Sequence, residues 1–224
     1  MTATIVDNFV APKCFQKIDI LFESTDFLLI NKPSGLLSLS GKNPLNKDSV
    51  HFRLVQDFPT ASLVHRLDLG TSGIMLIALN KPANTNLAGQ FQLRSVFKTY
   101  ISILAGHVIE DSGQIKMPIA KDPLLFPRLK ICIEHGKQAQ TDYQVLERLQ
   151  SPLSTRIRYE PLTGRTHQLR IHSQHIGHPI LGCDLYGTQQ THKAADRLML
   201  HAEKLQFDHP VTGKRIMAEC ACPF

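Results

Sequence analysis

The stretch VHRLDLGTSG, residues 64–73, places charged and turn-forming residues between two strongly apolar runs. The run before it is ASLV, and IMLIAL, which follows, has the length and composition of a buried strand. Asp, Ser, Thr and Gly favour tight turns, because their short side chains bond the local backbone and Gly accepts positive φ. The motif is therefore predicted to form a loop between two strands. Taken alone, Asp68 in such a loop is a turn residue and Arg66 a solvated surface cation.

The rest of the chain predicts further strands and few helices. Strand-like runs occupy 26–33, 95–106, 128–134, 139–149, 154–162 and both ends of 198–221. Helical spacing is found near 49–57, 80–94 and 166–177. This mixture predicts an α+β fold, with a mixed, mostly antiparallel central sheet, flanking helices and a catalytic cleft. We expect residues 1–20 to form an N-terminal arm and residues 21–224 a single catalytic domain whose two halves enclose that cleft.

Composition narrows the class of protein. With 42% hydrophobic and 20% charged residues, the 224-residue chain has the make-up of a globular protein. Its net charge of +6 suits a polyanionic partner such as RNA, DNA or an acidic membrane surface. The five cysteines form no CxxC pair, and no signal peptide or membrane-length apolar run is found, so we expect a cytoplasmic protein without a disulfide framework.

A second segment, EPLTGRTHQLRIHSQHIGHP at 160–179, concentrates basic residues around a turn that opens a helix. These residues are Arg165, His167, Arg170, His172, His175 and His178. Cations and backbone N–H groups at a helix N-terminus bind anions, and an Arg pairs a carboxylate through two parallel hydrogen bonds. The Arg-rich helix and the Asp68 loop are therefore expected to share one site.

Other chemistries find less support in the sequence. A metal-dependent hydrolase built on His167, His172 and His175 is one alternative, because imidazole is a common metal ligand. Against it, no carboxylate within the helix completes a ligand set, and the motif HExxH is absent. The motifs GxxxxGK[ST], GxGxxG and GxSxG are also missing. We expect no metal and no nucleotide or other cofactor.

Six ordered blocks carry a family resemblance that runs from Asp26 nearly to the C-terminus. They are NKPSGLL (31–37), HRLDLGTSG (65–73), KTY (98–100), LTGRTHQLRIH (162–172), GHPILGCD (177–184) and LMLHA (198–202). On these blocks the chain resembles the RluA-type pseudouridine synthases. Many members carry an N-terminal S4-type RNA-binding domain, but only about 25 residues precede the first block, too few for such a domain. Cys183, where many relatives have Gly followed directly by Asp, is a local departure from the pattern.

The resemblance implies a role for each matched residue. Asp68 would be the catalytic carboxylate, Tyr100 the aromatic residue stacked on the target base, and Arg170 the cation paired with Asp68. Leu200 would line the uracil pocket, and Arg66 would take the place of the flipped base in the RNA stem. The residues expected to assist Arg66 in RNA binding and base flipping are His65, Arg165 and Lys98.

The implied activity is the conversion of uridine to pseudouridine in structured RNA by a monomeric enzyme. The implied targets are uridine 32 in the tRNA anticodon stem-loop, uridine 746 of 23S rRNA, or both. The reaction cuts the N1–C1′ bond, turns the uracil over and joins C5 to C1′, so one carboxylate acting at the sugar is sufficient. A stacked uridine must first be flipped out, which an aromatic platform and a plug in the stem would favour. A non-catalytic basic RNA-binding module is the alternative from another class.

Overall fold

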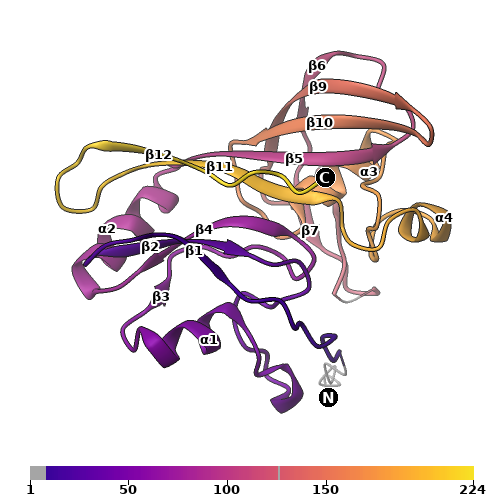
Figure 1. The fold of residues 1–224 in the computed structure, drawn as a ribbon. Coiled ribbons are helices and arrows are strands. Elements are labelled where there is room, and N and C mark those ends of the chain that lie inside the picture. Colours follow the sequence, from indigo (N-terminus) through magenta and orange to yellow (C-terminus); the bar gives the residue numbers. More distant parts are fainter. Residues whose placement is uncertain (1–8, 126) are drawn as a thin grey trace.

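The structure, a computed structural model, describes residues 9–125 and 127–224. Its main element is a ten-stranded sheet in the order β1-β2-β4-β11-β5-β10-β9-β6, with β3 paired to β4 and β12 paired to β11 (Figure 1). The strands of the N-terminal half are β1 (Asp19–Glu23), β2 (Phe27–Lys32), β3 (Ser62–Leu63) and β4 (Ser72–Ala78). The other strands of the sheet are β5 (Phe97–Ala105), β6 (Ser112–Lys116), β9 (Gln140–Gln150), β10 (Leu153–Pro161), β11 (Leu200–Asp208) and β12 (Arg215–Glu219). A separate hairpin joins β7 (Ile119–Lys121) to β8 (Leu129–Ile131).

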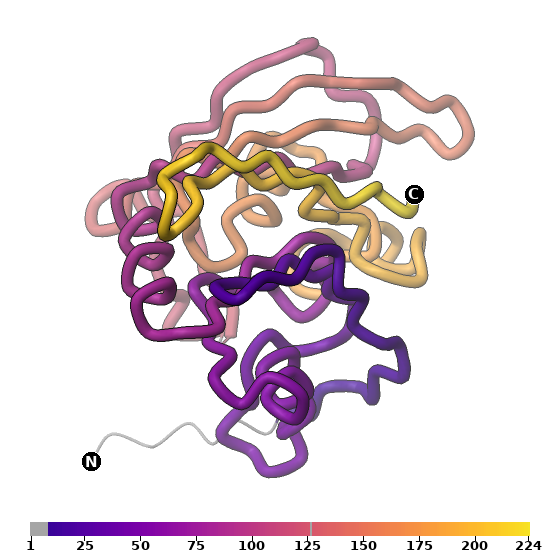
Figure 2. Tube along the Cα trace, turned by 60° about the vertical axis from the view of Figure 1, so that its left-hand side comes forward, coloured from indigo at the N-terminus to yellow at the C-terminus, as the bar shows by residue number. Residues whose placement is uncertain are grey.

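The molecule has two lobes, and each has its own hydrophobic core. In the tube view the indigo-to-magenta N-terminal segments and the pink-to-orange segments form these lobes, with the yellow C-terminal strands between them (Figure 2). One core gathers side chains of β2, β4, α1 (Val50–Asp57) and α2 (Lys81–Gln92). The other gathers side chains of β5, β10 and α3 (Gln168–His175). Tyr100 on β5 packs against both cores, at the junction of the lobes.

The two halves of the sheet meet where β4 runs beside β11. Among the described strand pairs this is the parallel one, with His201 opposite Ser72 and Ala202 opposite Gly73. Gly73 has φ +112°, and a Cβ placed there would lie 2.2 Å from the carbonyl oxygen of Ala202. Only glycine allows this close approach. The end of the 64–73 loop is therefore fixed against the strand that follows Leu198.

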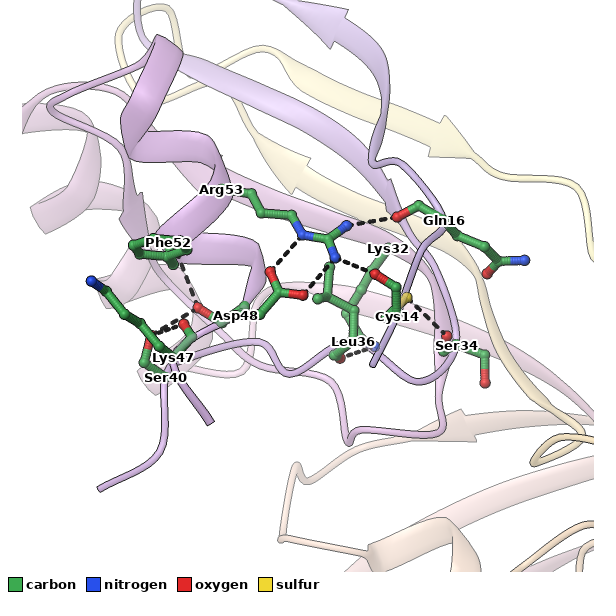
Figure 3. Close-up of polar contacts among 11 residues, drawn as sticks. Cys14, Gln16, Lys32, Ser34, Leu36, Ser40, Lys47, Asp48, Phe52 and Arg53 are labelled. Carbon is green, nitrogen blue, oxygen red and sulfur yellow. Dashed lines mark hydrogen bonds and ion pairs between the residues drawn. The ribbon is translucent and has the colours of Figure 1, made fainter. Parts of the chain in front are cut away.

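The N-terminal segment is fastened to α1 by one arginine (Figure 3). Arg53 pairs with Asp48 at 2.6 Å and donates to the backbone carbonyl oxygens of Cys14 and Gln16. Ser49 caps α1 by accepting from the N–H of Phe52 at 3.1 Å. Within the described part of the expected arm, residues 9–18 form no helix or strand.

The α+β class and the mostly antiparallel sheet are confirmed. The expected helices near 49–57, 80–94 and 166–177 correspond to α1, α2 and α3. The sequence reading missed β1, β6, β7, a 3-10 turn η1 (Pro44–Asn46) and the short helix α4 (Gln189–Lys193). β1 begins at Asp19, within the arm expected for residues 1–20, and the domain boundary itself stays a prediction. In the described part of the chain, every helix is too short or too polar to cross a membrane.

Candidate active site

A cleft of about 800 Å³ lies between the 64–73 loop, the C-terminal end of α2, the cleft face of β5 and the N-terminal end of α3. The sequence-predicted residues that line it are Asp68, Tyr100, Arg170, Leu200, Arg66, His65, Arg165 and Lys98. Residues more than 100 positions apart in the chain thus meet at one cavity. Among the described residues, Asp68 is the single carboxylate in its lining, beside five Arg and Lys side chains.

The loop that carries Asp68 is held by the segment 32–38, which follows β2. The hydroxyl of Ser38 donates to the carbonyl oxygen of Leu67 at 2.7 Å and accepts from its N–H at 3.1 Å. The N–H of Gly35 donates to the carbonyl oxygen of Leu69 at 2.8 Å. These bonds fix the backbone on both sides of Asp68, so the carboxylate projects from a rigid support.

Lys32 is the second part of this support, and the sequence reading assigned it no role. It is fully buried at the end of β2, and its Nζ donates to the carbonyl oxygens of Pro33 at 2.9 Å, Leu36 at 2.7 Å and Leu69 at 3.1 Å. Figure 3 shows the bond to Leu36. Burial lowers the pKa of Lys32 to about 7, although the negative charge of Asp68 opposes the change. The sequence did carry a sign of this role, because Lys32 ends the strand-like run FLLINK. A lysine buried in such a strand needs hydrogen-bond acceptors for all three of its donors.

Replacing Lys32 should loosen the catalytic loop. We expect Lys32→Met to lower the free energy of unfolding by about 2 kcal/mol, because three carbonyls lose a donor while the cost of burying an amine disappears. Denaturant unfolding measures the loss, and kcat should fall more than KM rises, because the Asp68 loop loses a support. Lys214→Met, at an exposed site, is the control. Unchanged stability and kcat would show that Lys32 does not hold the loop.

Arg170 is the cation at the base of the cleft, buried in the first turn of α3. Its Nη1 lies 3.9 Å from Oδ2 of Asp68, and its side chain is 5% exposed against 26% for Asp68. The guanidinium also pairs with Asp184, donates through Nε to Sγ of Cys183 at 3.3 Å and lies over the ring of Tyr186. Burial opposes its charge, but Cys183, Asp68 and Asp184 outweigh burial and raise its pKa. The departure from the family pattern at Cys183 therefore contacts the cation of the site itself.

Tyr100 and Leu200 form the apolar side of the cleft. Tyr100 is half-buried on β5, and burial and then the charge of Asp68 raise the pKa of its hydroxyl, so it stays a neutral ring. Leu200, 3% exposed at the start of β11, lies in the second core and also lines the cleft. A flat base entering the cleft would meet an aromatic face and an aliphatic side chain close to the carboxylate.

His65 shapes the loop through contacts within the protein. Its ring stacks on Phe91 with centroids 4.6 Å apart, and its Nε2 accepts from the N–H of Leu76 at 2.9 Å. Burial, with a smaller contribution from Lys98, lowers its pKa to about 3. His65 is thus a neutral acceptor bonded to β4, and the expected part in RNA binding stays a prediction.

This neutral histidine should make stability fall in acid. The pKa of His65 in the folded state lies below its unfolded value of about 6.5. As the pH falls below about 6.5, the unfolded chain therefore binds a proton that the folded protein does not, and the free energy of unfolding decreases. Between pH 7.5 and pH 5 the wild type should lose about 2 kcal/mol more free energy of unfolding than His65→Gln. Denaturant unfolding at the two pH values measures the difference. His135→Gln, at an exposed site, should behave as the wild type; equal losses in His65→Gln and the wild type would refute the assignment.

The remaining predicted cations lie around the mouth of the cleft. Arg66 is exposed, whereas Arg165 is partly buried and donates through Nε to the carbonyl oxygen of Gln138 at 3.0 Å. Lys98 stands two residues before Tyr100 on the same face of β5. Burial and then the charge of Arg94 lower the pKa of Lys98. The mouth is therefore positively charged and suited to a polyanion.

Three of the four histidines of the 160–179 segment are engaged in hydrogen bonds within the protein, and the fourth, His175, is exposed. His172 bonds Thr141 at 2.9 Å and the carbonyl oxygen of Met117 at 3.1 Å. His167 bonds the hydroxyl of Tyr186, and His178 bonds the carbonyl oxygen of Ala105. Across residues 9–125 and 127–224, no group of three or more His, Cys, Asp or Glu side chains is arranged to hold a metal ion. These contacts account for His167, His172 and His178 by hydrogen bonding within the protein.

Comparisons with known proteins identify the family of the chain. Residues 26–175 match the family model of the RNA pseudouridylate synthases. The chain is 45% identical to the dual-specificity RNA pseudouridine synthase RluA of Yersinia pestis, over 92% of this chain and 99% of that protein. It is 40% identical to the RluA of Escherichia coli K12, over 92% and 93% of the two chains. The solved structure of human RNA pseudouridylate synthase domain containing 1 is similar too, with a TM-score of 0.80 and 31% identity over 95% of this chain and 86% of that one.

The chain belongs to the RNA pseudouridylate synthase family. It is an isomerase that converts uridine to pseudouridine in RNA. The expectations for fold, family and reaction are therefore confirmed, whereas the roles of single residues stay predictions.

Proposed function

We propose that Asp68 acts at C1′ of a uridine flipped out of an RNA stem-loop. The observation that carries this proposal is that Asp68 is the single carboxylate lining the cleft among the described residues, 3.9 Å from the buried Arg170. The reaction consumes no redox equivalent and no phosphate energy, so an ionised carboxylate at the sugar, as in glycoside cleavage, is the group it requires. Arg170 neutralises and orients this carboxylate.

The rest of the cleft holds the everted nucleotide. Tyr100 stacks on the uracil and Leu200 packs against it, which keeps the free base in the site after the N1–C1′ bond is cut. The base then turns over, C5 bonds to C1′, and the hydrogen on C5 leaves as a proton while N1 gains one. Exposed Arg66 fills the gap left in the stem. Arg165 and Lys98 bind the RNA backbone, and His65 supports the loop from behind.

The RNA targets are proposed from the relatives. The Yersinia pestis and Escherichia coli proteins are named dual-specificity enzymes, and this chain covers 99% and 93% of their lengths. We infer that this protein also acts on two RNAs, uridine 32 of the tRNA anticodon stem-loop and uridine 746 of 23S rRNA. We further propose that it works in the cytoplasm as a monomer, because the cleft is formed within one chain.

Release of tritium tests the reaction and its targets together. RNA transcripts labelled with tritium at C5 of uridine should release it to water upon incubation with the protein, because C5 must lose its hydrogen to form the new bond. One equivalent should be released per tRNA anticodon stem-loop, and one per 23S rRNA fragment containing uridine 746. Release from only one RNA would refute dual specificity, and release from neither would refute the proposed substrates. A chelator should leave the rate unchanged.

A further inference from the structure

Two residues other than glycine have positive φ among the described residues, and both line the cleft. They are Arg94, with φ 60°, and His167, with φ 56°. An L residue in this left-handed conformation is strained, and such strain is often retained at functional sites. His167 has a contact that accounts for its position, because Nδ1 bonds the hydroxyl of Tyr186 at 2.9 Å. Arg94 needs another explanation.

Arg94 occupies the position after the C-cap of α2, where glycine is the usual residue. Leu93 caps the helix, and the N–H of Ser95 donates to the carbonyl oxygen of Gln90 at 3.0 Å, closing the last turn. Glycine at position 94 would adopt this positive φ without strain. The arginine side chain is therefore kept for something other than the fold.

The side chain of Arg94 has no partner within the described part of the protein. It is exposed at the cleft and makes no hydrogen bond or ion pair there. The side chain of Lys98 also makes no hydrogen bond or ion pair among these residues, and the charge of Arg94 acts on it. The cleft's carboxylate, Asp68, is engaged by Arg170. Two cations thus face the same space with no anion between them.

We propose that Arg94, together with Lys98, binds one backbone phosphate of the RNA substrate. The inference rests on the proposed function and adds to it a phosphate site at the α2–β5 corner of the cleft. A phosphate supplies the missing anion, and the guanidinium fork matches its geometry. Such a contact positions the RNA without reading its bases. Arg94 is thus a substrate-binding residue whose charge outweighs the strain of its backbone.

The variant R94G separates RNA binding from a structural role, because it should raise the stability of the protein and lower its affinity for RNA. Glycine relieves the strain, so Tm should rise by about 2–4 °C. The lost phosphate contact should weaken binding about tenfold and make the dependence of log K on log salt less steep by about one. The probe is an unmodified tRNA transcript, bound at several salt concentrations, with Asp68→Asn in every protein to prevent turnover. R94K should retain most of the affinity and the steeper salt dependence.

Matched controls make the outcome decisive. Lys81→Ala removes an exposed cation from the other end of α2 and should leave binding unchanged. R94N also tolerates the left-handed backbone, so it should lose affinity without losing stability. Unchanged affinity and salt dependence in R94G would overturn the proposal, as would a fall in Tm in both R94G and R94N that accompanies the weaker binding. The proposed function is judged separately, by tritium release from the protein with Asp68 intact.

Neutral phosphate analogues test the contact from the side of the RNA. Replacing single phosphates of the stem-loop by methylphosphonates should reveal one position that weakens binding of the protein carrying Arg94 clearly more than binding of R94G, which retains only Lys98 at that phosphate. A scan in which both proteins respond identically at every position would contradict a phosphate contact by Arg94.

Discussion

Asp68→Asn should abolish tritium release from C5-labelled RNA, lowering the rate by at least about 10⁴-fold, while the protein still binds that RNA. The amide is nearly isosteric with the carboxylate, so the cleft and its cations stay in place, but it lacks the charge needed to act at C1′. Single-turnover release measures the rate, and filter binding of the same transcript measures affinity. The expected pattern is a loss of chemistry without a comparable loss of binding.

Asp208→Asn is the matched control for this prediction, because Asp208 pairs with Arg215 outside the cleft lining and should leave the rate unchanged. Tritium release by Asp68→Asn at the wild-type rate would remove Asp68 from the mechanism. Loss of RNA binding equal to the loss of rate would instead identify Asp68 as a binding residue.

Arg170→Leu should lower kcat by about 10²–10³-fold, because Asp68 loses the group that neutralises and orients it. The same change leaves Asp184 and Cys183 without their donor. It should lower the free energy of unfolding by about 2 kcal/mol, which is less than for a fully buried pair, because Asp68 and Asp184 are 26% and 59% exposed. Single-turnover kinetics and denaturant unfolding measure the two effects.

Arg170→Lys divides the effect into charge and geometry. Lysine keeps the positive charge but loses the guanidinium fork, so kcat should fall less than in Arg170→Leu and remain well below the wild type. Arg158→Leu removes an arginine outside the cleft lining and should leave kcat unchanged. Wild-type kcat in a folded Arg170→Leu would exclude the proposed pairing with Asp68.

The sequence predicted best those elements whose pattern reflects burial. The apolar run FLLI forms the buried first part of β2, and Gly177, with φ +85°, follows the C-cap of α3, where the helix was expected to stop. β1 was missed because all five of its residues are exposed, so no alternation distinguishes it. The three-residue strand β7 and the five-residue helix α4 are too short for periodicity to show. Their formation depends on tertiary contacts.

The same limit applies to the site. Asp68, Tyr100 and Arg170 carry recognisable chemistry in recognisable blocks, and the cleft brings them together. The groups that support them could not be predicted, because their role depends on distances that the chain order hides. Ser38 resembles any other loop serine in the sequence, and only the structure shows that its hydroxyl bonds both the N–H and the carbonyl oxygen of Leu67. Arg94 carries no motif, and only its φ reveals the strain.

A structure of the protein bound to a stem-loop RNA tests the central claim most directly. The target uridine should carry fluorine at C5, where the reaction must release a proton, so that the nucleotide is trapped in the cleft. We predict that it is everted from the stem, with its base on the ring of Tyr100, its C1′ within reach of Asp68 and Arg66 in the vacated place. A uridine still stacked in its stem, or a base held away from Asp68, would contradict this account.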